Sequence, residues 1–275
     1  MAPWIAPLAR PHVQPKNAAL LHNPADAPLQ AIRGVSHEIS GFDLSESVHR
    51  LPVFVVCVQS YKKDSPSSGL FRVKVYNEHG MAQRNGTGMF PREVMNHFPL
   101  LPLEEEGRLN DLPLRENFIE RVFAYYRWTR MLDEEPTPGG LVKFHTAHKL
   151  TLMAHSPKHY TEMGRLVADA GNRDWDELTA EYGAMLMEGL GVMGTRGKHV
   201  NVLQHLMGYL KNHLSSEDKQ ELLGLIEDYR QGLVPLIVPL TLLKHHLNRY
   251  PVPEWVHQQV YLHPYPKELM LRNHV

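Results

Sequence analysis

The chain has 275 residues, which is enough for one or two compact domains with buried cores. An apolar content of 43% with a charged content of 21% is typical of globular proteins and excludes disordered, collagen-like and coiled-coil classes. Because 29 Lys and Arg stand against 30 Asp and Glu, the net charge is −1 and does not by itself attract a polyanion. Any binding of nucleic acid must therefore depend on a local positive patch.

The single cysteine, Cys57, excludes an intramolecular disulfide and the three or four thiolates that a zinc–cysteine cage or an iron–sulfur cluster needs. The most apolar stretch, residues 233–243, is interrupted by Pro235 and Pro239 and is shorter than the roughly 20 residues of a membrane span. The N-terminus lacks a basic region followed by an apolar one, so we expect no secretory signal. The expected location is the cytoplasm, without membrane contact.

The first half of the chain predicts an α/β unit. Residues 1–40 are rich in proline and are expected to form a poorly ordered leader, followed by a domain over residues 41–132. Within that domain we expect strands over residues 52–58 and 70–76, because the first is a β-rich run and the second alternates apolar and polar residues. Residues 77–88 are predicted as a loop, and residues 91–98 and 115–132 as helices.

The second half of the chain predicts helices only. Residues 133–140 are charged and rich in Pro and Gly, as joints between domains are. Helix starts are indicated by Ser156 before Pro157, by Asp174 with Glu177, and by Ser215 or Ser216. The expected helices span residues 141–154, 157–170, 175–190, 197–214, 217–232, 235–249 and 253–262. The predicted fold class is an α/β N-terminal part followed by an all-α domain over residues 141–275, mostly α overall.

Histidine is concentrated in the second half, where 12 of the 18 lie. Spacings of three and four residues could pair these side chains as metal ligands, but no HExxH motif or cysteine accompanies them after residue 140. The alternatives are histidines that cap helices or lie at domain surfaces, and a partly cationic helix face that holds phosphate or stacks on a base. That face would comprise His145, His148, Lys149, His155, Lys158 and His159.

A second polar set lies on the helix predicted over residues 197–214, where Asn201, Gln204 and His205 share one face. Buried amides and imidazoles need hydrogen-bond partners. We therefore expect either a structural network or a bound ligand there.

Two parts of the chain resemble known families. SPSSGLFRVKVY (residues 65–76), GTGMF (86–90) and EEEGRLNDLPLRENFIERVF (104–123) resemble the C-terminal half of the thiouracil desulfurase family. LVKFHTAHKLTLMAHSPKHY, NVLQHLMGYLK, YRQGLVPLIVPLTLLKHH and QVYLHPYPKELMLRN resemble the YbgA family over residues 141–273. The first resemblance implies an α/β half that holds a [4Fe–4S] cluster on three cysteines and removes sulfur from thiolated uracil. The second implies a helical half that helps to hold RNA, and fusions of the two are associated with 4-thiouridine in tRNA.

The chain departs from the desulfurase pattern at the cluster. Ser68 occupies the position of a ligand cysteine, and Cys57 does not align with one. Three thiolates cannot come from this chain, so the cluster is expected to be absent, no other cofactor or metal is expected, and the catalytic residues are unknown. The α/β half is then a truncated remnant without desulfurase chemistry, unless a partner supplies the missing ligands.

Three hypotheses about function remain. The first is a degenerate desulfurase-like protein whose helical domain binds RNA, with thiolated tRNA as the expected partner. The second is an enzyme in which His148, His155 or His205 acts as a general base or metal ligand. The third is an interaction module.

The residues expected to bind RNA or another ligand are Lys143, His145, His148, Lys149, His155, Lys158, Lys198, Asn201, His205 and Lys211. From residue 141 onward, 14 Lys and Arg stand against 14 Asp and Glu, so RNA binding requires a one-sided patch.

Overall fold

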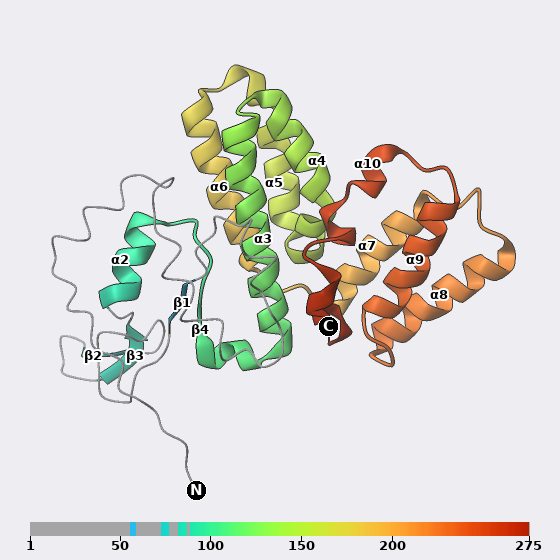
Figure 1. The fold of residues 1–275 in the computed structure, drawn as a ribbon, viewed down its shortest axis with the longest axis horizontal. Coiled ribbons are helices and arrows are strands. Elements are labelled where there is room, and N and C mark those ends of the chain that lie inside the picture. Colours follow the sequence, from blue (N-terminus) through green and yellow to red (C-terminus); the bar gives the residue numbers. More distant parts are fainter. Residues whose placement is uncertain (1–55, 59–72, 77–81, 87–88, 275) are drawn as a thin grey trace, which may run out of the picture. The chain divides into compact units, whose positions relative to one another are not determined.

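The computed structural model describes residues 56–58, 73–76, 82–86 and 89–274. The leader predicted over residues 1–40 and Ser68 lie outside these residues. Most of the described residues are helical, and from Pro138 onward the described chain forms helices and turns without a strand (Figure 1). The prediction of a mostly α protein with an all-α C-terminal part is therefore confirmed. No helix among the described residues combines the length and the apolar character that crossing a bilayer requires.

Two short strand pairs precede the helices. β1 (Val56–Val58) pairs in parallel with β4 (Leu103–Glu105), and β2 (Val73–Tyr76) pairs antiparallel with β3 (Ala82–Gly86). β1 and β2 lie within the two predicted strands. The loop predicted over residues 77–88 is wrong at β3, because backbone pairing with β2 outweighs the low strand propensity of its Asn and Gly residues. Helix α2 (Met89–His97) and the 3₁₀-helix η3 (Glu106–Asn110) connect these strands to the long helices.

Four helices share the first core: α3 (Leu112–Glu134), α4 (Pro138–His155), α5 (Pro157–Ala168) and α6 (Trp175–Gly191). Trp128 of α3 stacks on Tyr182 of α6 with the ring centroids 5.1 Å apart, and Phe144 of α4 meets both rings edge-on. Such aromatic contacts add to the apolar area that the core removes from water. α3 thus belongs to the same core as the helices that follow residue 137.

The second core is built from α7 (Arg196–Gly208), α8 (Ser216–Gln231), α9 (Ile237–Arg249) and α10 (Glu254–His257). α4 borders both cores, because Leu150 packs into the second and Leu152 into the first. A helix that is apolar on opposite faces must lie inside the helical unit.

Most of the predicted helix starts are confirmed. The side chains of Ser156, Asp174 and Ser215 each accept a hydrogen bond from a backbone N–H in the first turn of the helix that follows. The helix predicted over residues 197–214 is too long, since α7 ends at Gly208 and the chain continues in turns. Leu210 remains buried in the second core, so packing holds these turns in place although they are not helical.

The last predicted helix, over residues 253–262, is also interrupted. α10 ends at His257, and the 3₁₀-helix η5 (Val260–Leu262) follows. The buried Gln259 explains the break, because its side-chain amide donates to the Trp255 carbonyl, which a continuous helix would pair with a backbone N–H, and to the Thr146 carbonyl of α4.

The joint predicted over residues 133–140 is mostly helical. α3 continues to Glu134, and α4 begins at Pro138 after the N-cap Thr137, whose side chain accepts a hydrogen bond from the Gly140 N–H. Because both helices contribute to the first core, the unit that contains the helices begins before residue 133.

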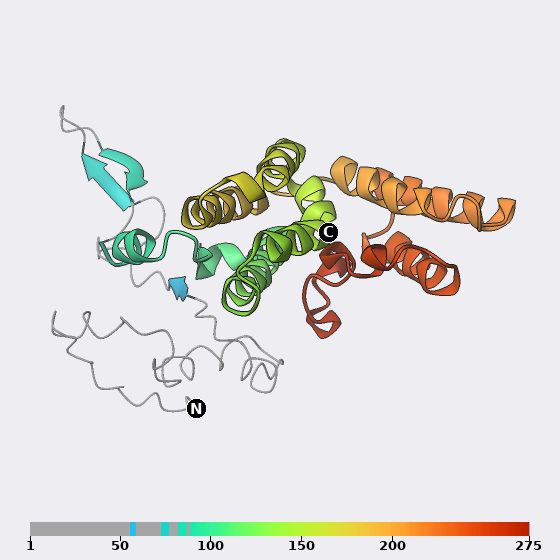
Figure 2. The same ribbon diagram turned by 90° about the horizontal axis from the view of Figure 1, so that it is seen from above.

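The C-terminal segment, residues 258–273, runs beside α3, α4 and α9. It contains η5, η6 (Lys267–Leu269) and η7 (Leu271–Asn273). In Figure 2 this dark red segment passes between the α3–α4 pair and α9. Hydrogen bonds from Arg127 of α3 and Lys244 of α9 to its carbonyls fix it on both sides.

Gly183 of α6 gives a test of the first core. A Cβ atom there would lie 2.9 Å from Leu100 and 3.0 Å from the Trp128 indole, whereas a Cβ on Gly224 of α8 meets nothing within 4 Å. We expect Gly183→Ala to lower the free energy of unfolding by about 1–3 kcal/mol through overpacking. Gly224→Ala should instead raise it by up to about 1 kcal/mol through helix propensity. Urea titration measures both, and a stabilised Gly183→Ala variant would contradict the packing described.

Candidate functional site

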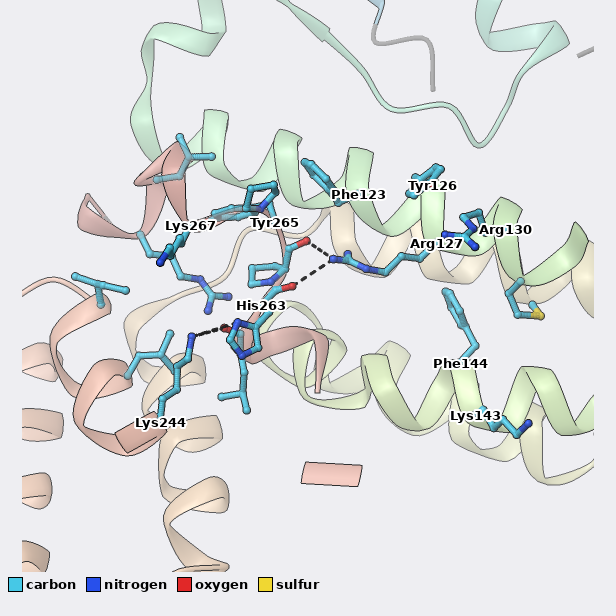
Figure 3. A pocket seen from close by; sticks show the side chains of 18 of the residues that line it. Phe123, Tyr126, Arg127, Arg130, Lys143, Phe144, Lys244, His263, Tyr265 and Lys267 are labelled. Carbon is cyan, nitrogen blue, oxygen red and sulfur yellow. Dashed lines mark hydrogen bonds between the residues drawn. The ribbon is translucent and has the colours of Figure 1, made fainter. Parts of the chain in front are cut away.

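The described part of the chain contains a cavity of about 1180 Å³ between α3, α4, α9 and the C-terminal segment (Figure 3). Its lining combines aromatic and cationic side chains. The polar and aromatic lining residues are Phe123, Tyr126, Arg127, Arg130, Glu134, Glu135, Lys143, Phe144, Lys244, His263, Tyr265, Lys267, Arg272 and Asn273. A concave, partly apolar site with a few converging polar groups is typical of ligand binding.

One end of the cavity is positively charged. The Lys244 Nζ donates to the Leu262 carbonyl at 3.2 Å and to His263 Nδ1 at 3.3 Å. Burial and the positive charges of Arg272 and Lys267 lower the pKa of Lys244. Burial, Lys244 and Arg272 likewise lower the pKa of His263. We name Lys244, His263 and Lys267 the anion end, because within the described residues no carboxylate forms an ion pair with them.

The α3 wall of the cavity carries half-buried aromatic rings. Phe123 and Tyr126 lie one turn apart on this helix, and both line the cavity. Between them and the C-terminal segment, the Arg127 Nη2 donates to the carbonyls of Pro264 at 2.7 Å and His263 at 3.2 Å. At the far rim, acidic residues are paired with cations: Glu134 with Arg130, and Glu135 with Lys143. The carboxylates of the lining are therefore engaged away from the anion end.

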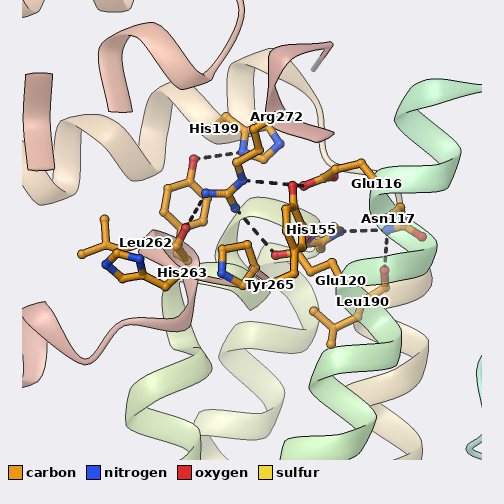
Figure 4. A network of polar contacts seen from close by, with 12 residues as sticks. Glu116, Asn117, Glu120, His155, Leu190, His199, Leu262, His263, Tyr265 and Arg272 are labelled. Carbon is orange, nitrogen blue, oxygen red and sulfur yellow. Dashed lines mark hydrogen bonds and ion pairs between the residues drawn. The ribbon is translucent and has the colours of Figure 1, made fainter. Parts of the chain in front are cut away.

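Behind the cavity lies a fully buried network of charges (Figure 4). Arg272 of η7 reaches α3, where its Nε lies 3.6 Å from Glu116 Oε1 and its Nη2 lies 3.8 Å from Glu120 Oε1. Its Nη1 donates to the Tyr261 carbonyl at 2.5 Å. His155, the last residue of α4, lies with its Nε2 3.0 Å from Glu120 Oε2, and its Nδ1 donates to the Val192 carbonyl at 2.7 Å. The Tyr265 hydroxyl donates to Glu116 Oε1 at 2.8 Å.

Opposite charges within this network offset the free-energy cost of burying Glu120 and His155 as ions. Burial alone would raise the pKa of Glu120, but His155 and Arg272 lower it to about 2. Burial alone would lower the pKa of His155, but Glu120, the Val192 carbonyl and Glu116 together raise it. Burial and the Glu120 carboxylate raise the pKa of Glu116. The Glu120–His155 pair is therefore an ion pair in the core, which stabilises the fold only while both partners stay charged.

Comparison with known proteins gives a family. Residues 149–266 match a family described as "Protein of unknown function (DUF1722)". The "Uncharacterized protein YbgA" of Escherichia coli (strain K12) is 33% identical over 159 residues, which are 58% of this chain and 94% of that protein. The chain belongs to the YbgA-like DUF1722 family. No solved structure matches it. The resemblance of the helical part to YbgA is thus confirmed, and the resemblance of residues 65–123 to thiouracil desulfurases stays a prediction.

The structure of this YbgA-like chain does not place the predicted ligand-binding residues on one surface. His145, His148 and His155 are buried among the helices. His145 Nδ1 lies 3.1 Å from the Tyr182 hydroxyl, and the His148 ring stacks on Phe144, to whose carbonyl its Nδ1 donates. The partly cationic face predicted on residues 145–159 is therefore interrupted, because all four of its histidines, His159 included, are buried.

The other predicted residues lie nearer to the surface, on several helices. Lys143 and Lys158 are exposed beside Glu135 and Glu162, and Asn201, His205 and Lys211 are exposed. The Lys149 Nζ lies 3.5 Å from the centroid of the Trp255 ring. The Lys198 Nζ donates to the His155 carbonyl at 2.6 Å, which satisfies the C-terminal end of α4. Of the ten residues, only Lys143 lines the cavity.

Sequence reasoning missed the anion end and the α3 wall. Lys244, His263, Lys267 and Arg272 lie in the motifs LTLLKHH and YLHPYPKELMLRN, which were used only for the resemblance. The cavity joins them to Arg127, more than 100 residues earlier, and no spacing rule connects such distant positions.

The residues present do not fit a [4Fe–4S] cluster. The chain has one cysteine, Cys57 in β1, so it cannot supply three thiolates. Within the described residues, no group of three or more His, Cys, Asp or Glu side chains is arranged to hold a metal ion.

The Glu120–His155 pair predicts a pH-dependent stability. The pKa of Glu120 falls from 4.5 to about 2, so its contribution is complete above pH 4.5 and is lost as pH falls toward 2. The pKa of His155 is raised above 6.5, so its contribution is complete below pH 6.5 and is lost as pH rises further. The Glu120→Gln variant should cost about 3–5 kcal/mol of unfolding free energy, most between pH 4.5 and 6.5.

Urea titrations of wild type and Glu120→Gln from pH 3 to pH 9 measure this difference. The matched control is Glu162→Gln, which removes a half-exposed partner of Lys158 and should change stability by less than about 0.5 kcal/mol. A cost for Glu120→Gln that stays the same at every pH would contradict the ion pair.

His148 predicts a pH effect on stability opposite to that of His155. Burial, followed by the charge of Arg127, lowers its pKa from 6.5 to about 3, so the unfolded chain binds the proton first. Stability is therefore present above pH 6.5 and is lost as pH falls toward 3. His148→Asn keeps a donor for the Phe144 carbonyl but does not titrate. We expect the loss of unfolding free energy between pH 6 and 4 to shrink by about 1.4 kcal/mol per pH unit.

The measurement for His148 is the unfolding free energy at pH 6, 5 and 4. His205→Asn, on the exposed face of α7, is the matched control and should keep the wild-type slope. An unchanged slope in His148→Asn would show that His148 is charged in the folded protein.

Proposed function

We propose that this protein binds RNA through the cavity between α3, α9 and the C-terminal segment, with thiolated tRNA as the substrate class. The observation that carries the proposal is that the anion end and the half-buried rings of Phe123 and Tyr126 line the same cavity. Proteins hold single-stranded RNA by neutralising phosphate with Lys and Arg and by stacking bases on aromatic rings. The cavity offers both kinds of group within one space.

The electrostatics support an anionic ligand. Burial lowers the pKa values of Lys244 and His263, and the positive charge of Arg272 lowers each further. A cluster of like charges costs free energy in the empty cavity, and an anion bound there would remove that cost. The chain as a whole is close to neutral, so this patch supplies the local positive charge that RNA binding requires.

The buried network favours binding over catalysis by histidine. The side chains of His155 and Glu120 are each 3% exposed, and the His148 ring is also buried. A general base must reach its substrate within hydrogen-bond distance. The burial of these residues therefore supports a structural role for them. The proposal is an RNA-binding member of the family without desulfurase chemistry in this chain. Its proposed location is the cytoplasm, where its tRNA would be.

Binding of tRNA by the full chain tests the proposal. Filter binding at 50 and 200 mM salt should show an affinity that falls with salt, because phosphate contacts release counterions. Lys244→Gln and Lys267→Gln should each weaken binding about 3–10-fold and make the log–log salt slope about 0.7 less steep. Lys219→Gln, an exposed lysine of α8, should bind like wild type.

The same assay separates the alternatives. Lack of measurable tRNA binding at 50 mM salt would overturn the proposal, and so would wild-type binding by both cavity variants. A comparison of tRNA with and without 4-thiouridine tests the thiolated substrate. Equal affinity would remove thiolation from the proposal and leave RNA binding in place.

A further inference from the structure

The anion end contains three nitrogen groups with defined roles (Figure 3). An ammonium only donates hydrogen bonds, so His263 Nδ1 must accept from Lys244, and the proton of the neutral imidazole lies on Nε2. Lys244 uses two of its three N–H donors on His263 and the Leu262 carbonyl. The third N–H, the His263 Nε2–H and the exposed Lys267 ammonium are then available to a ligand.

The groups behind this end keep it positive. Arg272 faces it from η7, and its charge acts on both Lys244 of α9 and His263. The carboxylates nearest to Arg272 are Glu116 and Glu120, which lie on α3 in the buried network. Arg127 of α3 faces the same turn, where it donates to the His263 and Pro264 carbonyls. Lys244 of α9 and Arg272 of η7 therefore act on the imidazole, and Arg127 of α3 holds its backbone.

We propose that Lys244, His263 and Lys267 form a seat for the terminal phosphate monoester of a nucleotide. A monoester carries a charge of about −1.5 to −2 at pH 7 and presents three terminal oxygens. Two ammonium groups and the His263 Nε2–H match this charge and these oxygens. An internal phosphodiester carries only one negative charge, on two such oxygens, and would leave one ammonium charge uncompensated.

The inference rests on the proposed function for its choice of a nucleotide, while the seat itself rests on the geometry of the anion end. The phosphate could belong to a free nucleotide or to the end of an RNA chain. The Phe123 and Tyr126 rings line the same cavity with the guanidinium groups of Arg127 and Arg130 lying 5.9 and 5.8 Å from their centroids, so the attached base would meet aromatic and guanidinium groups together.

Titration calorimetry on the full chain tests the seat with defined probes. Uridine 5′-monophosphate should bind at least 10-fold more tightly than uridine and than the methyl ester of the same phosphate. Lys244→Gln and His263→Ala should remove most of this preference, and His263→Gln, which keeps a side-chain N–H, should retain more of it than His263→Ala. Lys219→Gln should match wild type. Equal binding of the monophosphate and uridine would overturn the seat.

A second set of measurements distinguishes a free nucleotide from an RNA end as the source of the phosphate. The same measurements separate this inference from the proposed function. Removal of the 5′-phosphate from tRNA should weaken its binding, and uridine 5′-monophosphate should compete with it, if the seat takes an RNA end. Binding of the monophosphate without any binding of tRNA would support the seat and overturn RNA binding. Binding of tRNA that neither the monophosphate nor dephosphorylation affects, together with equal binding of the monophosphate and uridine, would overturn the seat and leave RNA binding standing.

Discussion

The burial of Arg272 is the constraint on which the cavity depends. A guanidinium in the core must be paired, and its partners Glu116 and Glu120 belong to α3, about 150 residues earlier in the chain. The C-terminal segment cannot leave α3 without exposing these charges or leaving them unpaired. Arg127 forms the reciprocal link, since it extends from α3 to the carbonyls of His263 and Pro264. Arg272 reaches from the C-terminal segment to α3, and Arg127 reaches from α3 to the C-terminal segment. Together these two side chains hold the C-terminal segment against α3 as one wall of the cavity.

The same arrangement places the positive and negative side chains in different parts of a nearly neutral chain. Arg272 is compensated on its α3 side by carboxylates, yet on the cavity side its charge adds to the effect of burial, which lowers the pKa values of Lys244 and His263. The acidic residues of the lining, Glu134 and Glu135, are paired at the far rim. A chain with a net charge of −1 can thus carry a group of positive side chains at one end of a cavity, because the carboxylates of the lining lie at the other end.

The sequence predicted the helices well because their caps are local. Ser156, Asp174 and Ser215 act within one turn of their own helices, so the signal lies in a few adjacent residues. The predictions from sequence failed where tertiary contacts determine the secondary structure. β3 exists through its pairing with β2, and α10 stops because the Gln259 amide bonds elsewhere. The histidines of α4 misled for a related reason: this helix is packed on both faces, and periodicity cannot tell a polar inner face from a polar surface.

The candidate site was beyond sequence reasoning because its parts are brought together only by the fold. Residues 149–266, which match the family, contain Lys244 and His263, whereas the aromatic wall comes from α3, outside that match. Phosphate and base would then be held by different parts of the chain, joined through the Arg127 and Arg272 links. In this proposal the base and the phosphate belong to one ligand, so each contact would lower the orientational entropy cost of the other. The charged network would contribute to such binding by holding α3 and the C-terminal segment together, although none of its buried carboxylates needs to touch the ligand.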